Sequence, residues 1–141
     1  MMERKRLAAI EKVIFLKSVD IFRHAPIEEL GRIAALTEEV HFEAGETIFR
    51  KGEPTDAIYL ILAGRVAIES NGQIVREVTE KQALGTVAAL DRNPAVHTVK
   101  AIDAVYALKL NAQDFDDILS VDFELVRAVF HALCQIIREG Q

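Results

Sequence analysis

The stretch of sequence that decides the fold runs from residue 45 to residue 66: Gly45-Glu-Thr-Ile-Phe-Arg-Lys-Gly52-Glu-Pro-Thr-Asp-Ala-Ile-Tyr-Leu-Ile-Leu-Ala-Gly64-Arg-Val66. Two runs in it, 47–50 and 57–62, have the length and the β-branched and aromatic content of single strands. Gly45, Gly52 and Gly64 flank these runs, where a chain that reverses direction needs backbone freedom. The segment is therefore predicted to form short strands joined by tight turns.

The same pattern extends outward over residues 39–110. Further strands are predicted at 40–42, 65–69, 74–78, 96–101 and 104–110. Asn71-Gly72, between two of them, is a pair that two-residue hairpins prefer, because both positions need a positive φ. Many short strands at near-regular spacing predict an antiparallel β-roll of the jelly-roll kind, rather than alternating strands and helices.

Helices are predicted on both sides of this roll, because apolar residues recur there every three to four positions. Leu7, Ile10 and Ile14 place a first helix before residue 18, and Pro26 suits the first turn of a second. Asn111 is a favoured N-cap, and a long helix is predicted over 122–138. The chain is thus expected to be one α+β domain, with N-terminal helices in 1–38, the roll in 39–110 and C-terminal helices in 111–141.

Composition narrows the function classes. The chain has 141 residues, half of them hydrophobic, and a net charge of −5, which fits one folded domain and argues against a nucleic-acid surface spread over it. Its single cysteine, Cys134, excludes an internal disulfide and sites built on several thiolates. No apolar run approaches the ~18 residues of a membrane span. We therefore expect a cytoplasmic protein without membrane insertion.

The segment 45–66 closely resembles the signature of cyclic-nucleotide-binding domains, and the resemblance extends from about Phe15 to Arg138. This family includes bacterial regulators of the catabolite activator type, regulatory subunits of cyclic-nucleotide-dependent kinases and gated channels. The resemblance implies a regulatory β-roll that binds cyclic AMP or cyclic GMP through a phosphate-binding cassette. The chain stops just after the helix predicted over 122–138, so we expect it to lack the helix-turn-helix that an activator of this type needs to bind DNA.

The family cassette begins Phe-Gly-Glu and ends Pro-Arg-Ala-Ala-Thr, and it matches residues 84–98 here. Gly85, Pro94 and Thr98 agree with the pattern. Thr86 stands where the resemblance implies a glutamate for the ribose hydroxyl, and Ala95 stands where it implies an arginine for the cyclic phosphate. The candidate ligand-binding residues of the cassette are Gly85, Thr86, Val87, Ala95, Val96, His97 and Thr98.

These two replacements should weaken nucleotide binding. Hydrogen bonds to charged groups contribute ~1.5–3 kcal/mol each, so the loss of two costs about 3–6 kcal/mol. That is roughly two to four decades of affinity. We therefore predict a regulatory or interaction module that requires no cofactor and binds cyclic AMP or cyclic GMP weakly or not at all.

A genuine sensor is the alternative, for a cyclic nucleotide or another small anion held by substituted contacts. The backbone N–H groups of the short helical turn predicted after Gly85 could attract an anion. Arg92, His97, Thr98 and Lys100 are the side chains that could replace the missing contacts. The sequence shows no catalytic constellation and no metal-ligand spacing, so we expect no enzyme.

The C-terminal helix has an apolar arc of about 200°, wider than one core-facing stripe needs. One side of the arc can close over the roll. The other side, formed by Leu125, Val129, Ala132 and Ile136, is predicted to pair with a second copy of the chain. The alternatives are that an N-terminal helix of the same chain covers it, or that an effector domain outside this chain does.

Overall fold

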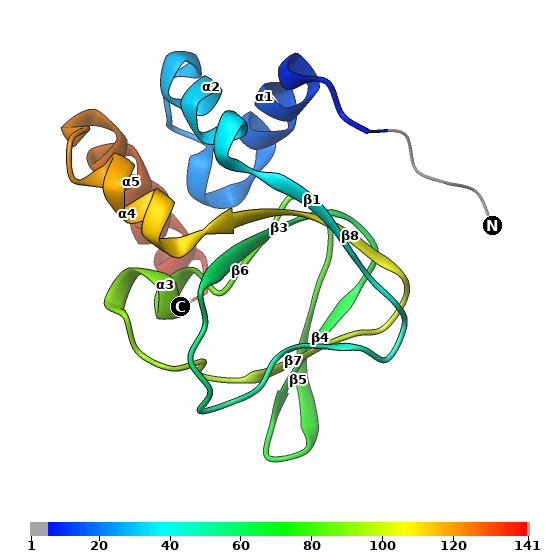
Figure 1. The fold of residues 1–141 in the computed structure, drawn as a ribbon. Helices are drawn as coiled ribbons and strands as arrows, with labels where there is room; N and C mark the ends of the chain where they lie inside the picture. Colours follow the sequence, from blue (N-terminus) through cyan, green and yellow to red (C-terminus); the bar gives the residue numbers. More distant parts are fainter. Residues whose placement is uncertain (1–5, 141) are drawn as a thin grey trace.

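Two four-stranded antiparallel sheets form the centre of the computed structural model, which describes residues 6–140 (Figure 1). The first sheet has the order β1 (Glu38–Phe42), β8 (Val105–Asn111), β3 (Ala57–Ala63), β6 (Ala83–Leu84). The second has the order β2 (Thr47–Phe49), β7 (Thr98–Ala101), β4 (Val66–Ser70), β5 (Gln73–Val78). The predicted β-roll is confirmed, with strands that begin and end within one or two residues of most predicted limits. β6 was not predicted, because two residues carry no periodic pattern.

The helices gather at one end of the roll (Figure 1). They are α1 (Ala9–Ser18), the 3-10 turn η1 (Asp20–Phe22), α2 (Ile27–Leu36), α3 (Thr86–Asp91), α4 (Ala112–Leu119) and α5 (Phe123–Glu139). Side-chain caps fix where the last two begin. Asn111 Oδ1 accepts the N–H groups of Gln113 and Asp114, and Asp122 Oδ1 accepts that of Leu125. The caps satisfy backbone donors that have no partner within the helix.

The predicted hairpin at Asn71-Gly72 is present. Ser70 pairs with Gln73 across it, and the two turn residues have φ values of 54° and 80°. Positive φ at both positions matches the right-handed twist of the flanking strands β4 and β5.

The hydrophobic residues divide between two cores, and β3 contributes to both. Ile58 and Leu60 face the helices, where they pack with Phe22, Phe115 and Leu125. Ile61 belongs instead to the core between the sheets. Alternation along the strand therefore lets one sheet hold the roll together and anchor the helices.

The prediction that Leu125, Val129, Ala132 and Ile136 form a dimer interface on α5 is wrong. Leu125, Val129 and Ala132 are 0%, 3% and 0% exposed, and Ile136 is partly buried against the same core. η1 of the same chain packs against α5, and these α5 residues share one core with residues of α1, α2 and the first sheet. A helical wheel shows the width of an apolar arc but not which half of it a distant segment will cover.

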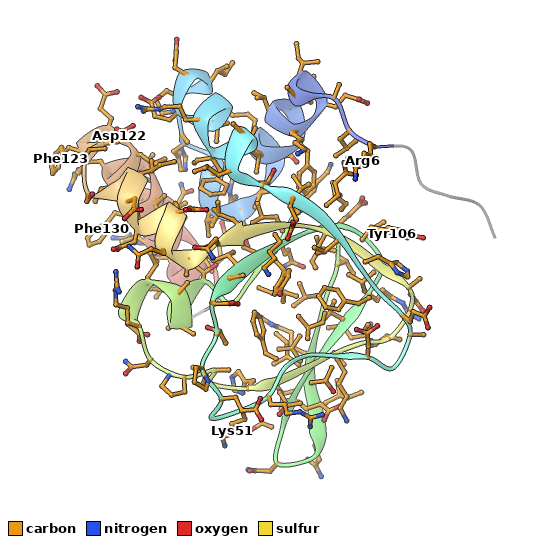
Figure 2. The ribbon with its side chains drawn as sticks, in the orientation of Figure 1. Arg6, Lys51, Tyr106, Asp122, Phe123 and Phe130 are labelled. Atoms are coloured by element: carbon orange, nitrogen blue, oxygen red, sulfur yellow. The ribbon has the colours of Figure 1, made fainter. Side chains whose placement is uncertain are left out.

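The exposed apolar side of α5 is a different one. Phe123, Phe130 and Ile137 are 75%, 61% and 60% exposed. Figure 2 shows Phe123 and Phe130 on the outer side of the helical end of the molecule. We call these three residues the outer face of α5. No helix among residues 6–140 is long and apolar enough to cross a membrane.

Candidate functional site

The cassette segment 84–98 folds against the roll through a close contact at Gly85. This residue has a φ of +86°, in the left-handed region that favours glycine. A Cβ there would lie 2.7 Å from Cζ of Phe49 and 3.1 Å from the carbonyl oxygen of Ala57. Glycine therefore lets the chain turn sharply from β6 into α3 while it touches the roll.

A cavity of about 470 Å³ lies beside this turn, and we call it the cassette cavity. Its size falls within the ~300–1,000 Å³ typical of small-molecule sites. η1 and α5 border it, since Asp20 and Leu133 are among the lining residues. Its apolar walls include Phe49, Ile68, Val78, Leu84, Val99, Leu133 and Ile136. The tertiary structure thus joins the cassette to the N-terminal and C-terminal helical segments.

Most of the candidate cassette residues line this cavity: Gly85, Thr86, Val87, Ala95, Val96 and His97. Thr98 does not. Its hydroxyl oxygen accepts the backbone N–H of Lys51 at 3.1 Å, which occupies it in a contact between the ends of β2 and β7.

Three side-chain polar atoms of the lining residues are buried and have no hydrogen-bond partner within residues 6–140. They are the Oγ1 atoms of Thr55 and Thr86 and the Nδ1 atom of His97. Thr86 is only 9% exposed as a whole residue. Buried polar atoms are almost always hydrogen-bonded, so these three are exceptions among the lining residues.

Neither of the predicted substitute cations lines the cassette cavity. Arg92 has a φ of 58° at the end of α3, and its guanidinium group donates to the carboxylate of Asp116 on α4. Lys100 lies 3.7 Å from the Glu69 carboxylate. Lys100 alternates along β7 with the buried residues Val99 and Ala101, which face inward, so its own side chain faces outward.

Two charged residues that the sequence analysis missed do line the cassette cavity. Arg76 comes from β5 and Asp20 from η1. Burial raises the pKa of the Asp20 carboxyl above its ordinary value. Two interactions oppose this rise in pKa: the backbone N–H of Ile21 donates to Oδ1 at 2.7 Å, and Arg76 contributes a positive charge. No sequence signal links these residues, because only the packing of β5 and η1 brings them to one cavity.

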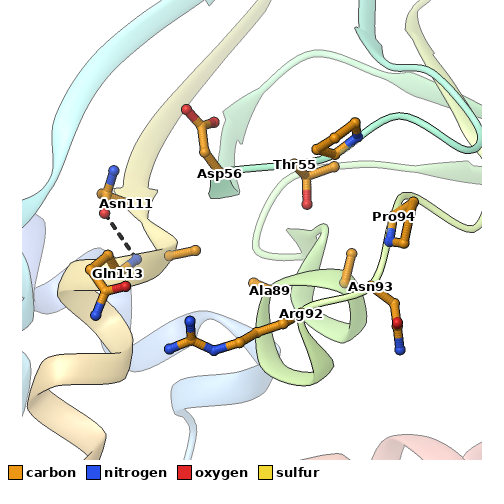
Figure 3. Close-up of a pocket in the computed structure, with 11 residues that line it drawn as sticks. Thr55, Asp56, Ala89, Arg92, Asn93, Pro94, Asn111 and Gln113 are labelled. Atoms are coloured by element: carbon orange, nitrogen blue, oxygen red, sulfur yellow. Dashed lines mark hydrogen bonds between the residues drawn. The ribbon is translucent and has the colours of Figure 1, made fainter.

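A second cavity, of about 410 Å³, lies between α3 and the start of α4 (Figure 3). Its polar lining residues include Thr55, Asp56, Arg92, Asn93 and Gln113. Thr55 lines both cavities. The side chain of Arg92 therefore belongs to this second cavity and not to the one that the cassette borders.

The part of the chain that the structure describes contains no group of three or more His, Cys, Asp or Glu residues placed to hold a metal ion. Two of the histidines contact each other: the rings of His24 and His131 are 4.3 Å apart, and His24 Nε2 lies 2.7 Å from Oε1 of Gln135.

Comparison with known proteins gives a consistent result. The model of the cyclic nucleotide-binding domain family matches residues 39–122. A cAMP-dependent protein kinase regulatory subunit of Dictyostelium discoideum is 32% identical over 110 residues, which are 72% of this chain and 34% of the subunit. An uncharacterized NTE family protein of Mycobacterium bovis is 27% identical over 127 residues, which are 89% of this chain and 22% of that protein. The chain thus spans about a third or less of these relatives.

Among solved structures, a regulatory subunit of a cAMP-independent protein kinase A from Trypanosoma brucei is similar, with a TM-score of 0.74 and 25% identity. The match covers 91% of this chain and 48% of the subunit. That structure is of a triple-substitution variant bound to cAMP in its A site, and one of the substitutions replaces threonine with arginine.

Proposed function

Because the chain belongs to the cyclic nucleotide-binding domain family, we propose that it is a non-catalytic regulatory module whose cavity binds cyclic AMP and cyclic GMP weakly or not at all. The observation that carries the proposal is the neutral character of the cassette. Thr86 and Ala95 line the cavity at the positions of the family's glutamate and arginine, while Arg92 and Lys100 are paired elsewhere.

The two replaced cassette positions, Thr86 and Ala95, do not fit a cyclic phosphate. The phosphate keeps its negative charge at neutral pH, and an anion that leaves water without a counter-charge loses much of its solvation free energy. Arginine suits this role because its planar donors match two phosphate oxygens at once. Ala95, which is 8% exposed, offers neither charge nor a side-chain donor.

The test is calorimetric titration of the unmodified chain and of the double variant Thr86→Glu/Ala95→Arg with cyclic AMP and cyclic GMP. We expect the unmodified chain to show no binding below about millimolar ligand, and the double variant to gain about a hundredfold or more. Arg92→Ala is the matched control, and it should change neither titration. Micromolar binding by the unmodified chain would refute the proposal, as would a double variant that folds but gains no affinity.

A genuine ligand sensor is the second candidate, and the unpartnered polar atoms favour it. Thr55, Thr86 and His97 line the cavity, and each carries a buried polar atom that has no hydrogen-bond partner among the described residues. A sensor gains stability when its ligand is added, whereas a pure interaction module does not. The temperature of thermal unfolding, measured with and without an added small molecule, therefore distinguishes a sensor from an interaction module.

We propose that the protein acts in the cytoplasm. We also propose that a second copy of the chain covers the outer face of α5. The supporting observation is that Glu124, Arg127 and Arg138, all exposed, flank the three apolar residues with charges of both signs. A surface that carries both signs can be complementary to itself about a twofold axis. An effector domain is the alternative partner.

A further inference from the structure

Arg76 lies on the face of β5 that borders the cassette cavity. Residues two apart in a strand share a face, and Val78 belongs to the core between the sheets and lines this cavity. Arg76 pairs across the ladder with Ile68 of β4, which is 7% exposed and also lines the cavity. Residues directly opposite each other on paired strands share one face of the sheet. Both neighbours therefore place the Arg76 side chain on the cavity side, in agreement with its place among the lining residues.

The guanidinium group of Arg76 has no ion pair or hydrogen bond within the part of the chain that the structure describes. The next residue, Glu77, pairs with Arg65 at 3.6 Å, and no carboxylate pairs with Arg76. Asp20 lines the same cavity and interacts with Arg76 only through its charge, while a backbone N–H occupies its Oδ1 atom. The planar donors of the guanidinium are therefore open to a partner from outside the chain.

The other walls of the cavity are mostly apolar. Ile68 and Val78 come from the roll, and Leu133 and Ile136 come from α5. Arg76 is exposed, whereas Ile68 and Val78 are buried, so the charge lies at the rim of the cavity and the apolar walls lie deeper. Contact with these walls removes apolar ligand surface from water, which is favourable. A molecule that is apolar at one end and negative at the other matches this arrangement.

A carboxylate is the anionic group that suits this position. Its two oxygens can accept two parallel hydrogen bonds from one guanidinium group. A phosphate monoester carries about −1.5 to −2 charges at neutral pH, so the nearby carboxylate of Asp20 would repel it more strongly than a group with one charge. Arg76 lies on β5 and not in the cassette, so this pairing does not depend on the two replaced cassette positions.

We propose that the cassette cavity takes a small monocarboxylate with an apolar body, whose carboxylate pairs with Arg76 and whose body contacts Leu133 and Ile136. This inference rests on the proposed function, since it names the ligand class of the same cavity. Arg76 then supplies the counter-charge that neither Arg92 nor Lys100 places in this cavity.

The experiment uses a panel of small aromatic and aliphatic rings, each as its carboxylate and as its primary amide, for example 1-naphthaleneacetate and 1-naphthaleneacetamide. Binding to the whole chain is measured by ligand-detected NMR at about pH 8, which keeps ordinary imidazole groups neutral. We expect at least one carboxylate to bind about threefold or more tightly than its amide. Arg76→Gln should bring the two affinities within about twofold, because the charge is lost while most of the apolar stem remains. Lys100→Gln is the matched control, since it removes a cation that faces outward, and it should leave the preference unchanged.

Asp20→Asn is the second variant, and it removes the negative charge beside Arg76. It should strengthen carboxylate binding about two- to threefold and leave amide binding unchanged. The inference fails if the amides bind the unmodified chain as tightly as the carboxylates, or if no carboxylate binds at millimolar concentration. It also fails if a folded Arg76→Gln variant keeps the preference, or if Asp20→Asn weakens carboxylate binding. Failure of the proposed function is a separate outcome: micromolar binding of cyclic AMP refutes that function, whereas silence from both carboxylates and cyclic nucleotides refutes only this inference.

Discussion

Gly85 is the residue on which the shape of the cassette depends. Gly85→Ala combines a left-handed φ of +86° with a Cβ 2.7 Å from the Phe49 ring. Strain of about 1–3 kcal/mol and overpacking of about 1–3 kcal/mol predict a loss of roughly 2–6 kcal/mol of unfolding free energy. Urea unfolding measures it. Gly31→Ala is the matched control, because a Cβ there meets nothing within 4 Å, and it should stabilise α2 by about 0.5–1 kcal/mol.

Asp20 gives a second prediction at this scale, for the dependence of stability on pH. Burial raises the pKa of its carboxyl above the ordinary 3.8 in the folded state. The stability that Asp20 contributes is therefore present below 3.8 and is lost as the pH rises through the folded-state pKa. Asp20→Asn keeps an oxygen for the Ile21 N–H but cannot ionise. Its stability relative to the unmodified chain should rise from about pH 3.5 to about pH 7, as urea midpoints at each pH would show.

Asp103 supplies a control of opposite sign. The Arg65 guanidinium, which donates to its carboxylate at 2.8 Å, holds the pKa of Asp103 below its ordinary range. The stability from this pair is present above the ordinary pKa and is lost as the pH falls through the folded-state value. Asp103→Asn should therefore lose stability relative to the unmodified chain as the pH rises. The same trend in both variants would contradict the role assigned to Asp20.

Among the elements, α5 depends on how its N-terminus is held. Asp122 is 9% exposed, accepts the N–H of Leu125 at 3.0 Å and forms an ion pair with Arg32. Asp122→Ala should destabilise the chain by about 1–3 kcal/mol, because a buried backbone donor loses its partner. Arg32→Ala separates the cap from the ion pair. The Arg32 side chain is 55% exposed, so this variant should cost less than about 1 kcal/mol, and an equal cost in urea unfolding would assign the effect to the ion pair.

For the whole molecule, the question is what covers the outer face of α5. If a second copy does, sedimentation velocity should show a dimer that dissociates on dilution. Phe130→Asp should favour the monomer about tenfold or more, because an interface core excludes an unpaired charge. Ile74→Asp is the matched control, since Ile74 is similarly exposed, at 60%, but lies on β5. A monomer at all concentrations would leave the effector domain as the partner.

Features that depend on near neighbours were predictable from the sequence. The hairpin at Asn71-Gly72, the cap at Asn111 and the helical turn after Gly85 all follow from backbone preferences within a few residues. Alternation and helical periodicity placed most strands and helices for the same reason. The family cassette was recognised because its residues are consecutive, and this also made the neutral positions Thr86 and Ala95 visible.

Only the tertiary structure decided which residues share the cassette cavity and which face of α5 is open. Arg76, Asp20 and Thr55 reach the cavity from three separate segments, while Arg92 turns to Asp116. Leu125 is buried because η1 and its neighbours pack there, which leaves Phe130 exposed. The sequence by itself determined the roll, its turns and the loss of the cassette charges, because short-range dihedral preferences and periodicity encode them. Burial and pairing depend instead on segments far apart in the chain, whose packing competes for the same apolar surface.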